Sequence, residues 1–293
     1  MNRLDDAGAY PIREFARLTG VNPVTLRAWE RRYGIIRPER TAKGHRFYTD
    51  DHITQVKHIL YWLDQGYPIR QVRMLLKDGA EIPTDGQARQ QEWQECQTLL
   101  LAAARRLNAQ HLEELWNNGF ATYPLAVYFD YCLRPVLEKL RGDQHSALHA
   151  HCFEYLLKRK LAALLMQHQR QIGGPAVLAA CQHPQAELET LASACALSAA
   201  EIRVEYFGSG LSVADLTEAT QQLDISHLWL HLSPLAENLN SEWQALPARV
   251  QKPVCLSGAS HFPLSDHNNI RVMPVPLAQQ IRSFITGLAE ERV

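Results

Sequence analysis

The residues best suited to binding chemistry lie in one stretch, "TLRAWERRYGIIRPERTAKGHRFY", which covers positions 25–48. It contains Arg27, Arg31, Arg32, Arg37, Arg40, Lys43 and Arg46, interleaved with Trp29, Tyr33, His45, Phe47 and Tyr48. Guanidinium and ammonium groups are the side chains that bind phosphate oxygens, so the stretch suits a polyanionic partner such as nucleic acid. A solvated charged surface is the alternative, and charge alone does not separate the two.

The charge of the whole chain is split between its two ends. Residues 1–77 hold 14 Lys and Arg against 8 Asp and Glu, a net charge of +6, whereas the other 216 residues hold 16 against 23, a net charge of −7. A basic module on an acidic body indicates that only the first module meets a polyanion.

The elements that must position these cations begin with a pair of short helices. In "YPIREFARLTGVNPVTLRAWERRYG", an apolar stripe over 12–18 predicts the first helix, and the turn "TGVN" follows it. Asn22 is a good N-cap, Pro23 fits the first helical position, and Gly34 ends the second helix after Tyr33. This order is typical of a helix-turn-helix. The second helix is expected to present Thr25, Arg27, Ala28, Arg31 and Arg32 to solvent, while Val24 and Leu26 help pack it against the module.

A small wing is expected after this pair of helices. Pro38 forbids helix, "TAKG" is a turn, and "HRFY" alternates as a short strand does. The wing would carry Lys43 at its tip and His45 and Arg46 on its return strand. A helix follows that Thr49 or Asp50 caps, and a shorter one ends at Gly79.

The motifs "TLRAWERRYG", "RPERTAKGHRFYTDDHI" and "LDQGYPIRQVRMLL" resemble the winged-helix DNA-binding domain of the MerR family over residues 10–77. At positions 29 and 45 the family more often has tyrosine. The Trp29 and His45 found here resemble the MlrA-like and CarH-like branch of the family. The resemblance implies DNA contacts by Arg27, Trp29, His45 and Arg46 to the backbone or minor groove. Thr25 and Ala28 are the expected base-edge neighbours, and the wing residues Arg40 and Lys43 join the interface. Arg31 and Arg32 are either phosphate contacts or part of a solvated face.

The family resemblance also implies partners and a mode of action. Such regulators act as homodimers on double-stranded promoter DNA with pseudo-twofold symmetry. They distort an overlong promoter spacer so that RNA polymerase engages both of its boxes. The chain is therefore expected to be a transcriptional regulator, with activation favoured over repression.

The middle segment, 79–172, reads as four helices with little strand signal, which predicts a helical bundle. His145 and His149 lie at i and i+4, a spacing that can bind a metal, but no Glu or Cys of the same helix supplies a third ligand. We expect surface histidines there and no metal site.

The segment 173–293 alternates strands and helices, which predicts a Rossmann-like parallel sheet with helices on both faces. The fold class is thus multidomain, α and α/β, with domains expected at 1–78, 79–172 and 173–293. A helical bundle before such a sheet resembles the cobalamin-binding module of the CarH-like branch.

The resemblance to a cobalamin module breaks down at the residues that would hold cobalt. The ligand histidine of that family follows the first strand, and the matching stretch here is "HPQAELE", which puts Ala186 at the histidine. Alanine has no lone pair for a metal. His183 lies three residues early, and in the bundle the Trp and Glu-His of the family become Leu140 and Ala150-His151. We expect no cofactor. This half is expected to bind another ligand, to bind a regulatory protein, or to serve only as a scaffold, and a cobalamin-dependent light or ligand sensor is the alternative.

The remaining sequence features narrow the class of protein. There is no apolar run that could span a membrane, the first residues lack a secretory signal, and the six cysteines form no C-x-x-C pair. A cytoplasmic protein with reduced thiols is expected. His231, Ser233, Asp266 and His267 fall near strand ends, but no motif groups them, so an enzyme is not expected.

Overall fold

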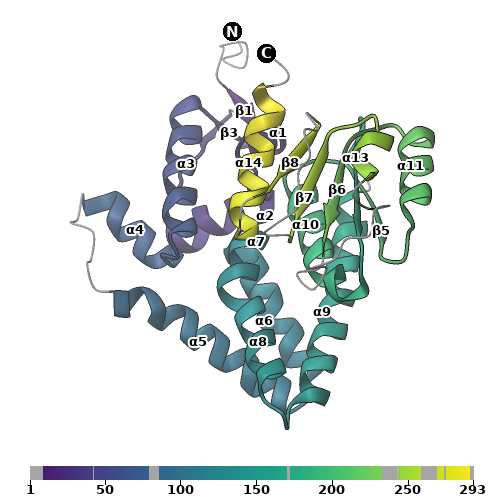
Figure 1. Ribbon diagram of the computed structural model, residues 1–293. Helices are drawn as coiled ribbons and strands as arrows, with labels where there is room; N and C mark the ends of the chain where they lie inside the picture. Colours follow the sequence, from purple (N-terminus) through teal and green to yellow (C-terminus); the bar gives the residue numbers. More distant parts are fainter. Residues whose placement is uncertain are drawn as a thin grey trace. The chain divides into compact units, whose positions relative to one another are not determined.

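The computed structural model describes residues 9–41, 43–78, 86–169, 172–232, 243, 245–258, 269–273 and 275–290 (Figure 1). The chain divides into two compact units. One comprises Met1–Leu156 with Ala199–Glu201, and the other comprises Leu157–Ser198 with Ile202–Val293. The three domain boundaries expected from the sequence stay a prediction.

The first unit begins with a winged helix. Its elements are β1 (Tyr10–Pro11), α1 (Ile12–Thr19), α2 (Pro23–Ala28), the π-helical turn η1 (Trp29–Tyr33), β2 (Glu39–Arg40), β3 (Arg46–Tyr48), α3 (Asp50–Asp64) and α4 (Ile69–Asp78). The strands form an antiparallel sheet in the order β1-β3-β2. The wing pair β2-β3 was expected; β1 was not, because two residues are too few to show a period.

The core of the winged helix lies under this small sheet. Phe15 of α1 stacks on Tyr48 of β3 with ring centroids 4.0 Å apart, and both rings are fully buried. Burial raises the pKa of the Tyr48 phenol to about 12. Thr49 caps α3 as expected, in a reciprocal box with His52.

Helices fill the rest of the first unit. They are α5 (Gly86–Arg105), α6 (Ala109–Thr122), α7 (Leu125–Tyr128), the π-helical turn η2 (Phe129–Leu133), α8 (Arg134–Gly142) and α9 (Ala147–Gln169), which continues into the second unit. Trp116 of α6 and Phe153 of α9 pack edge to face in the bundle core. The predicted helical segment is confirmed.

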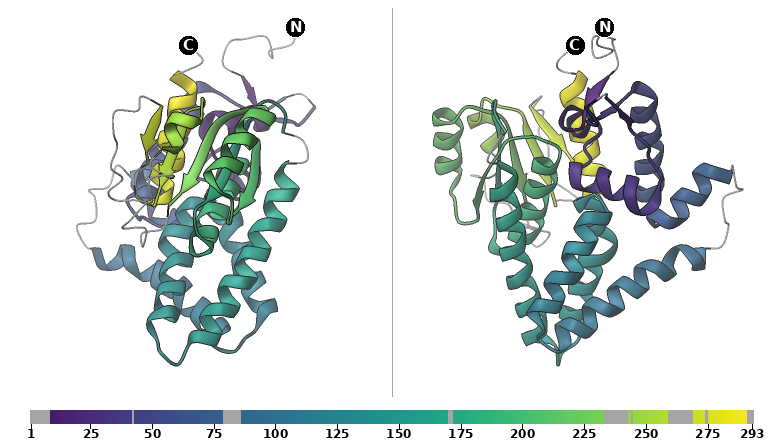
Figure 2. Two further views of the ribbon diagram at one scale, coloured as in Figure 1. Left: turned by 45° about the vertical axis from the view of Figure 1, so that its right-hand side comes forward. Right: turned by 180° about the vertical axis from the view of Figure 1, so that it is seen from behind.

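The second unit is built on a parallel sheet (Figure 2). Its strands are β4 (Ala176–Cys181), β5 (Val204–Gly208), β6 (Ile225–His231), β7 (Val254–Ser257) and β8 (Ile270–Val272), in the order β5-β4-β6-β7-β8. Its helices are η3 (a 3-10 turn, Pro184–Ala186), α10 (Glu187–Ala199), α11 (Val213–Gln222), α13 (Leu246–Arg249) and α14 (Leu277–Glu290).

Both faces of this sheet are covered, as a parallel sheet requires. Leu178 and Leu230 share a buried cluster with Leu216 of α11, while Trp229 packs on Phe284 of α14 from the other face. The predicted α/β class is confirmed. None of the helices in the described part of the chain is long and apolar enough to cross a membrane.

Candidate nucleic-acid interface

The second helix of the helix-turn-helix starts and stops as its sequence predicts. The Asn22 carboxamide oxygen accepts a hydrogen bond from the Val24 amide at 2.7 Å, and Pro23 takes the first helical position. The helix runs through α2 and η1 to Tyr33 and ends at Gly34, whose φ of +57° favours glycine. We call Pro23–Tyr33 the recognition helix.

One face of the recognition helix is open and basic. Val24, Arg27 and Arg31 follow one another at i, i+3 and i+7, so they share a face, and all three side chains are exposed, as is Arg32. Among the described residues, no carboxylate forms an ion pair with Arg27, Arg31 or Arg32. These guanidinium groups are therefore available to an anionic partner.

The opposite face of the recognition helix is closed, and here the predicted orientation was wrong. Thr25 and Trp29 are fully buried and Ala28 is 9% exposed. The indole Nε1–H of Trp29 donates to the Thr122 carbonyl at 2.8 Å, and the Thr25 hydroxyl donates to the Phe120 carbonyl at 3.4 Å. The last carbonyls of a helix have no partner within it, so these two side chains cap the end of α6.

The wing is held to the recognition helix by one carboxylate. Glu30 binds Arg46 Nε at 2.5 Å through one oxygen and an Arg40 terminal nitrogen at 2.8 Å through the other. The wing turn closes with the Gly44 amide donating to the Thr41 carbonyl, at a Gly44 φ of +80°. Lys43 and His45 remain exposed beside this turn.

We call Glu30, Arg40 and Arg46 the Glu30 clamp; their opposite charges stabilise one another. Burial raises the pKa of the Glu30 carboxyl, but the hydrogen bonds and charges of Arg46 and Arg40 outweigh it, and the net pKa is lowered. Because Glu30 stays ionised, Arg46, whose side chain is 17% exposed, is oriented by the recognition helix. Arg40 is half exposed and keeps a surface for another partner.

The structure thus places the expected site residues in one module, but it separates exposed residues from buried ones. Arg27, Arg31, Arg32, Lys43 and His45 are exposed cations or cation formers, Arg40 and Arg46 are clamped, and Thr25, Ala28 and Trp29 are interior. The inward orientation expected of Val24 was wrong, since its side chain is 52% exposed, and the role of Glu30 was not predicted. Helical spacing from Arg27 and Arg31 could have found Val24, whereas nothing in the local sequence indicates the contact with α6.

In the second unit, the position that the family resemblance matches to a cobalt ligand is Ala186, which has no donor atom. Ala186 is 3% exposed and ends the turn η3. The exposed His183 caps that turn, with its Nδ1 accepting from the Gln185 amide at 3.3 Å. No group of three His, Cys, Asp or Glu side chains in the described chain could hold a metal ion, and His145 and His149 belong to no such group. Within the described residues, the position matched to the family's ligand histidine thus does not fit a histidine-ligated cobalamin.

The carboxyl edge of the parallel sheet, where such folds bind ligands, carries one buried polar pair. His231 ends β6 and Ser257 ends β7 beside it, with the serine hydroxyl 3.0 Å from His231 Nδ1. The other candidates, Ser233, Asp266 and His267, lie outside the described residues. The expectation that no motif groups these residues into an enzyme stays a prediction.

The basic N-terminal module is the part of the chain that matches a known protein family. The family model for the MerR HTH family regulatory protein matches residues 10–79. The chain is 39% identical over 135 residues to the HTH-type transcriptional regulator MlrA of Salmonella typhimurium strain LT2, an alignment that covers 46% of this chain and 53% of that protein. The chain thus spans about half the length of this relative.

A second relative aligns over most of both chains. The HTH-type transcriptional repressor CarH of Myxococcus xanthus is 29% identical over 273 residues, covering 86% of this chain and 89% of that protein. A solved cobalamin-binding protein from Desulfitobacterium hafniense DCB-2 covers 66% of this chain and 97% of its own at 11% identity. Its TM-score of 0.29 is too low to assign a fold or a ligand.

Proposed function

Since the chain carries an N-terminal MerR helix-turn-helix domain and is homologous over much of its length to MlrA and CarH regulators of that family, we propose that it is a sequence-specific DNA-binding transcriptional regulator. The observation that carries this proposal is the open basic face of the recognition helix. The recognition helix exposes Arg27, Arg31 and Arg32, which form no ion pair with a described carboxylate. The wing exposes two further basic side chains, Lys43 and His45. Such a face suits phosphate contacts on both sides of a major groove.

The side chains take different roles at the DNA. Val24, Arg27 and Arg31 face the major groove, because they form the exposed stripe at the start and middle of the recognition helix. Lys43 and His45 meet the adjacent backbone or minor groove. Arg40 and Arg46 join them from the Glu30 clamp.

Thr25, Ala28 and Trp29 act from inside the module. They fix the direction of the recognition helix by packing it against α6, and base-edge contact falls to their outward neighbours. This assignment differs from the family expectation, in which Trp29 reaches the DNA.

We propose a homodimer on promoter DNA that activates transcription by distorting the spacer, so that RNA polymerase engages both promoter boxes. Paired wings would supply the backbone clamps that untwisting needs. The relative that aligns over most of its length is named a repressor, and repression by blocking polymerase is therefore the second candidate.

We propose further that the second unit works without cobalamin and responds to another ligand or to a regulatory protein. Support comes from the buried methyl group at position 186 and from the capping role of His183. A cobalamin-dependent sensor is the alternative.

DNA binding is tested by selection of bound duplexes from a random library, followed by titration of the selected site. Val24→Ala is expected to change the preferred sequence, and Arg27→Gln to weaken binding to every sequence. Equal affinity for selected and random duplexes at physiological salt would refute sequence-specific binding. Transcription in vitro from the selected promoter then separates activation from repression.

The cobalamin question has its own test. The purified chain is incubated with adenosylcobalamin in the dark, desalted and examined by absorbance. Retained corrinoid absorbance would overturn the cobalamin-free proposal and favour the sensor. A colourless protein that still binds its selected duplex agrees with the proposal.

A further inference from the structure

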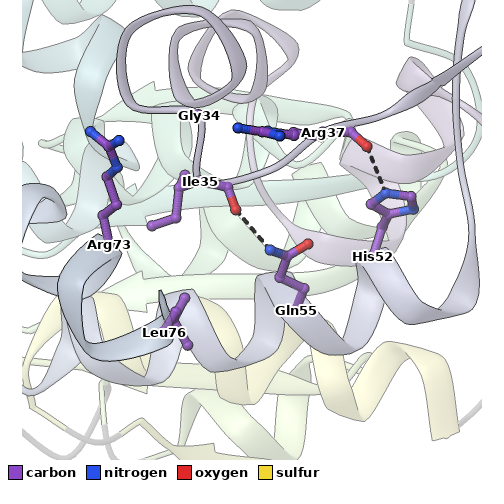
Figure 3. Close-up of a pocket in the computed structure, with 7 residues that line it drawn as sticks. All are labelled: Gly34, Ile35, Arg37, His52, Gln55, Arg73 and Leu76. Carbon is purple, nitrogen blue, oxygen red and sulfur yellow. Dashed lines mark hydrogen bonds between the residues drawn. The ribbon is translucent and has the colours of Figure 1, made fainter. Parts of the chain in front are cut away.

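A pocket of about 430 Å³ opens beside the recognition helix within the winged helix (Figure 3). Its floor is apolar, from Ile35 and Leu76, and its rim carries Arg37 and Arg73. Ile35 and Arg37 lie between the recognition helix and β2, and Arg73 and Leu76 lie on α4. Neither the helix-turn-helix face nor the Glu30 clamp uses this pocket.

Two side chains of α3 fix the pocket wall. The Gln55 amide nitrogen donates to the Ile35 carbonyl at 2.7 Å, as Figure 3 shows. His52 Nδ1 accepts from the Thr49 amide at 3.0 Å, so its Nε2 carries the proton and donates to the Arg37 carbonyl, also at 3.0 Å. These bonds tie residues 35–37 to α3, and the pocket is formed before any ligand arrives.

The rim of the pocket carries two positive charges. Arg37 extends over Ile35 toward the side of the pocket on which Arg73 stands, and both side chains are exposed. No described carboxylate forms an ion pair with either guanidinium, whereas Glu30 forms ion pairs with the neighbouring Arg40 and Arg46. Two exposed guanidinium groups on the lining of one pocket favour an anion there.

We propose that this pocket binds a phosphate group between Arg37 and Arg73. A guanidinium presents paired N–H groups that match two oxygens of one anion, and a phosphate has enough oxygens for two such forks. A carboxylate can bridge two arginines, as Glu30 does, but it offers only two oxygens and one negative charge, whereas a phosphate offers more oxygens and up to two charges for two guanidinium groups. The volume exceeds that of a lone ion, so there is room for the group that carries the phosphate, against the apolar floor.

The phosphate has two sources, a phosphorylated small molecule or the DNA backbone. The backbone version rests on the proposed DNA-binding function, and the small-molecule version does not. Arg37 lies two residues before β2. A phosphate bound to it would therefore, from either source, hold in place the segment that leads from the recognition helix into the wing.

The first arm of the test uses inorganic phosphate and full-length protein. Phosphorus NMR follows the line width of the phosphate signal as protein is added, for the wild type, Arg37→Gln, Arg73→Gln and Arg106→Gln. Arg106 is an exposed arginine of the helical bundle and serves as the matched control. Broadening by the wild type and the control, but by neither pocket variant, is the result expected of a free phosphorylated ligand.

The second arm measures DNA affinity against salt for the same four proteins. A backbone phosphate in the pocket predicts that each pocket variant lowers the slope of log K against log salt by about one, while Arg106→Gln leaves it unchanged. The proposal is wrong if the wild type does not broaden the phosphate signal and both pocket variants keep the wild-type salt slope. A wild type that binds no DNA refutes the proposed function, and the first arm alone then decides on the pocket.

Discussion

Replacing Trp29 by phenylalanine tests whether this residue serves the interior or the DNA. The indole is fully buried, and its Nε1–H binds the Thr122 carbonyl at 2.8 Å. Phenylalanine keeps most of the packing but leaves that carbonyl buried without a donor, which costs about 1–3 kcal/mol. The smaller ring adds about 1 kcal/mol through incomplete filling of the site. The total is about 2–4 kcal/mol.

The loss is measured by urea unfolding, followed by far-ultraviolet circular dichroism. With a slope of about 2 kcal/mol per molar, the midpoint of the transition of the first unit should fall by about 1–2 M. Thr25→Val is the control: it removes the neighbouring hydrogen bond to α6, which is 3.4 Å long, and should cost less than about 1 kcal/mol.

DNA binding by Trp29→Phe should keep its salt dependence, since no phosphate contact is removed. An unchanged urea midpoint together with weaker binding and a lower salt slope would refute the interior role. Trp29 would then contact DNA as the family resemblance implies.

The remaining predictions concern the recognition helix, its ion pairs with the wing, and position 186 of the second unit. Arg27→Gln and Arg31→Gln should each weaken binding to selected and random duplexes alike and lower the salt slope by about one, as fluorescence anisotropy would show. Glu30→Gln should cost about 1–3 kcal/mol at neutral pH, measured by urea unfolding, because two arginines lose a charged acceptor. Since the folded pKa of Glu30 is lowered, its stabilisation is present above the unfolded pKa and is lost as pH falls through the folded one, so the midpoints of wild type and Glu30→Gln should converge in acid. Ala186→His is expected to remain colourless after incubation with adenosylcobalamin and desalting, because one added imidazole does not restore the other family residues of the site. A coloured variant would show that the histidine at position 186 is all that the site lacks.

The sequence by itself determined the local structure of the winged helix. Asn22, Pro23 and Gly34 fix where the recognition helix begins and ends, because capping and a positive φ depend on single residues. The alternation of strand and helix after residue 175 likewise gave the parallel sheet, since each buried strand reads as a short apolar run.

Only the tertiary structure decided which face of the recognition helix is free. Thr25 and Trp29 sit on a helix that local sequence leaves open on all sides, and their burial comes from α6, more than 90 positions along the chain. The same is true of the phosphate pocket, which joins Arg37 to Arg73 across three separate elements. Pairings of this kind depend on how helices pack, and neither periodicity nor composition of one segment contains that information.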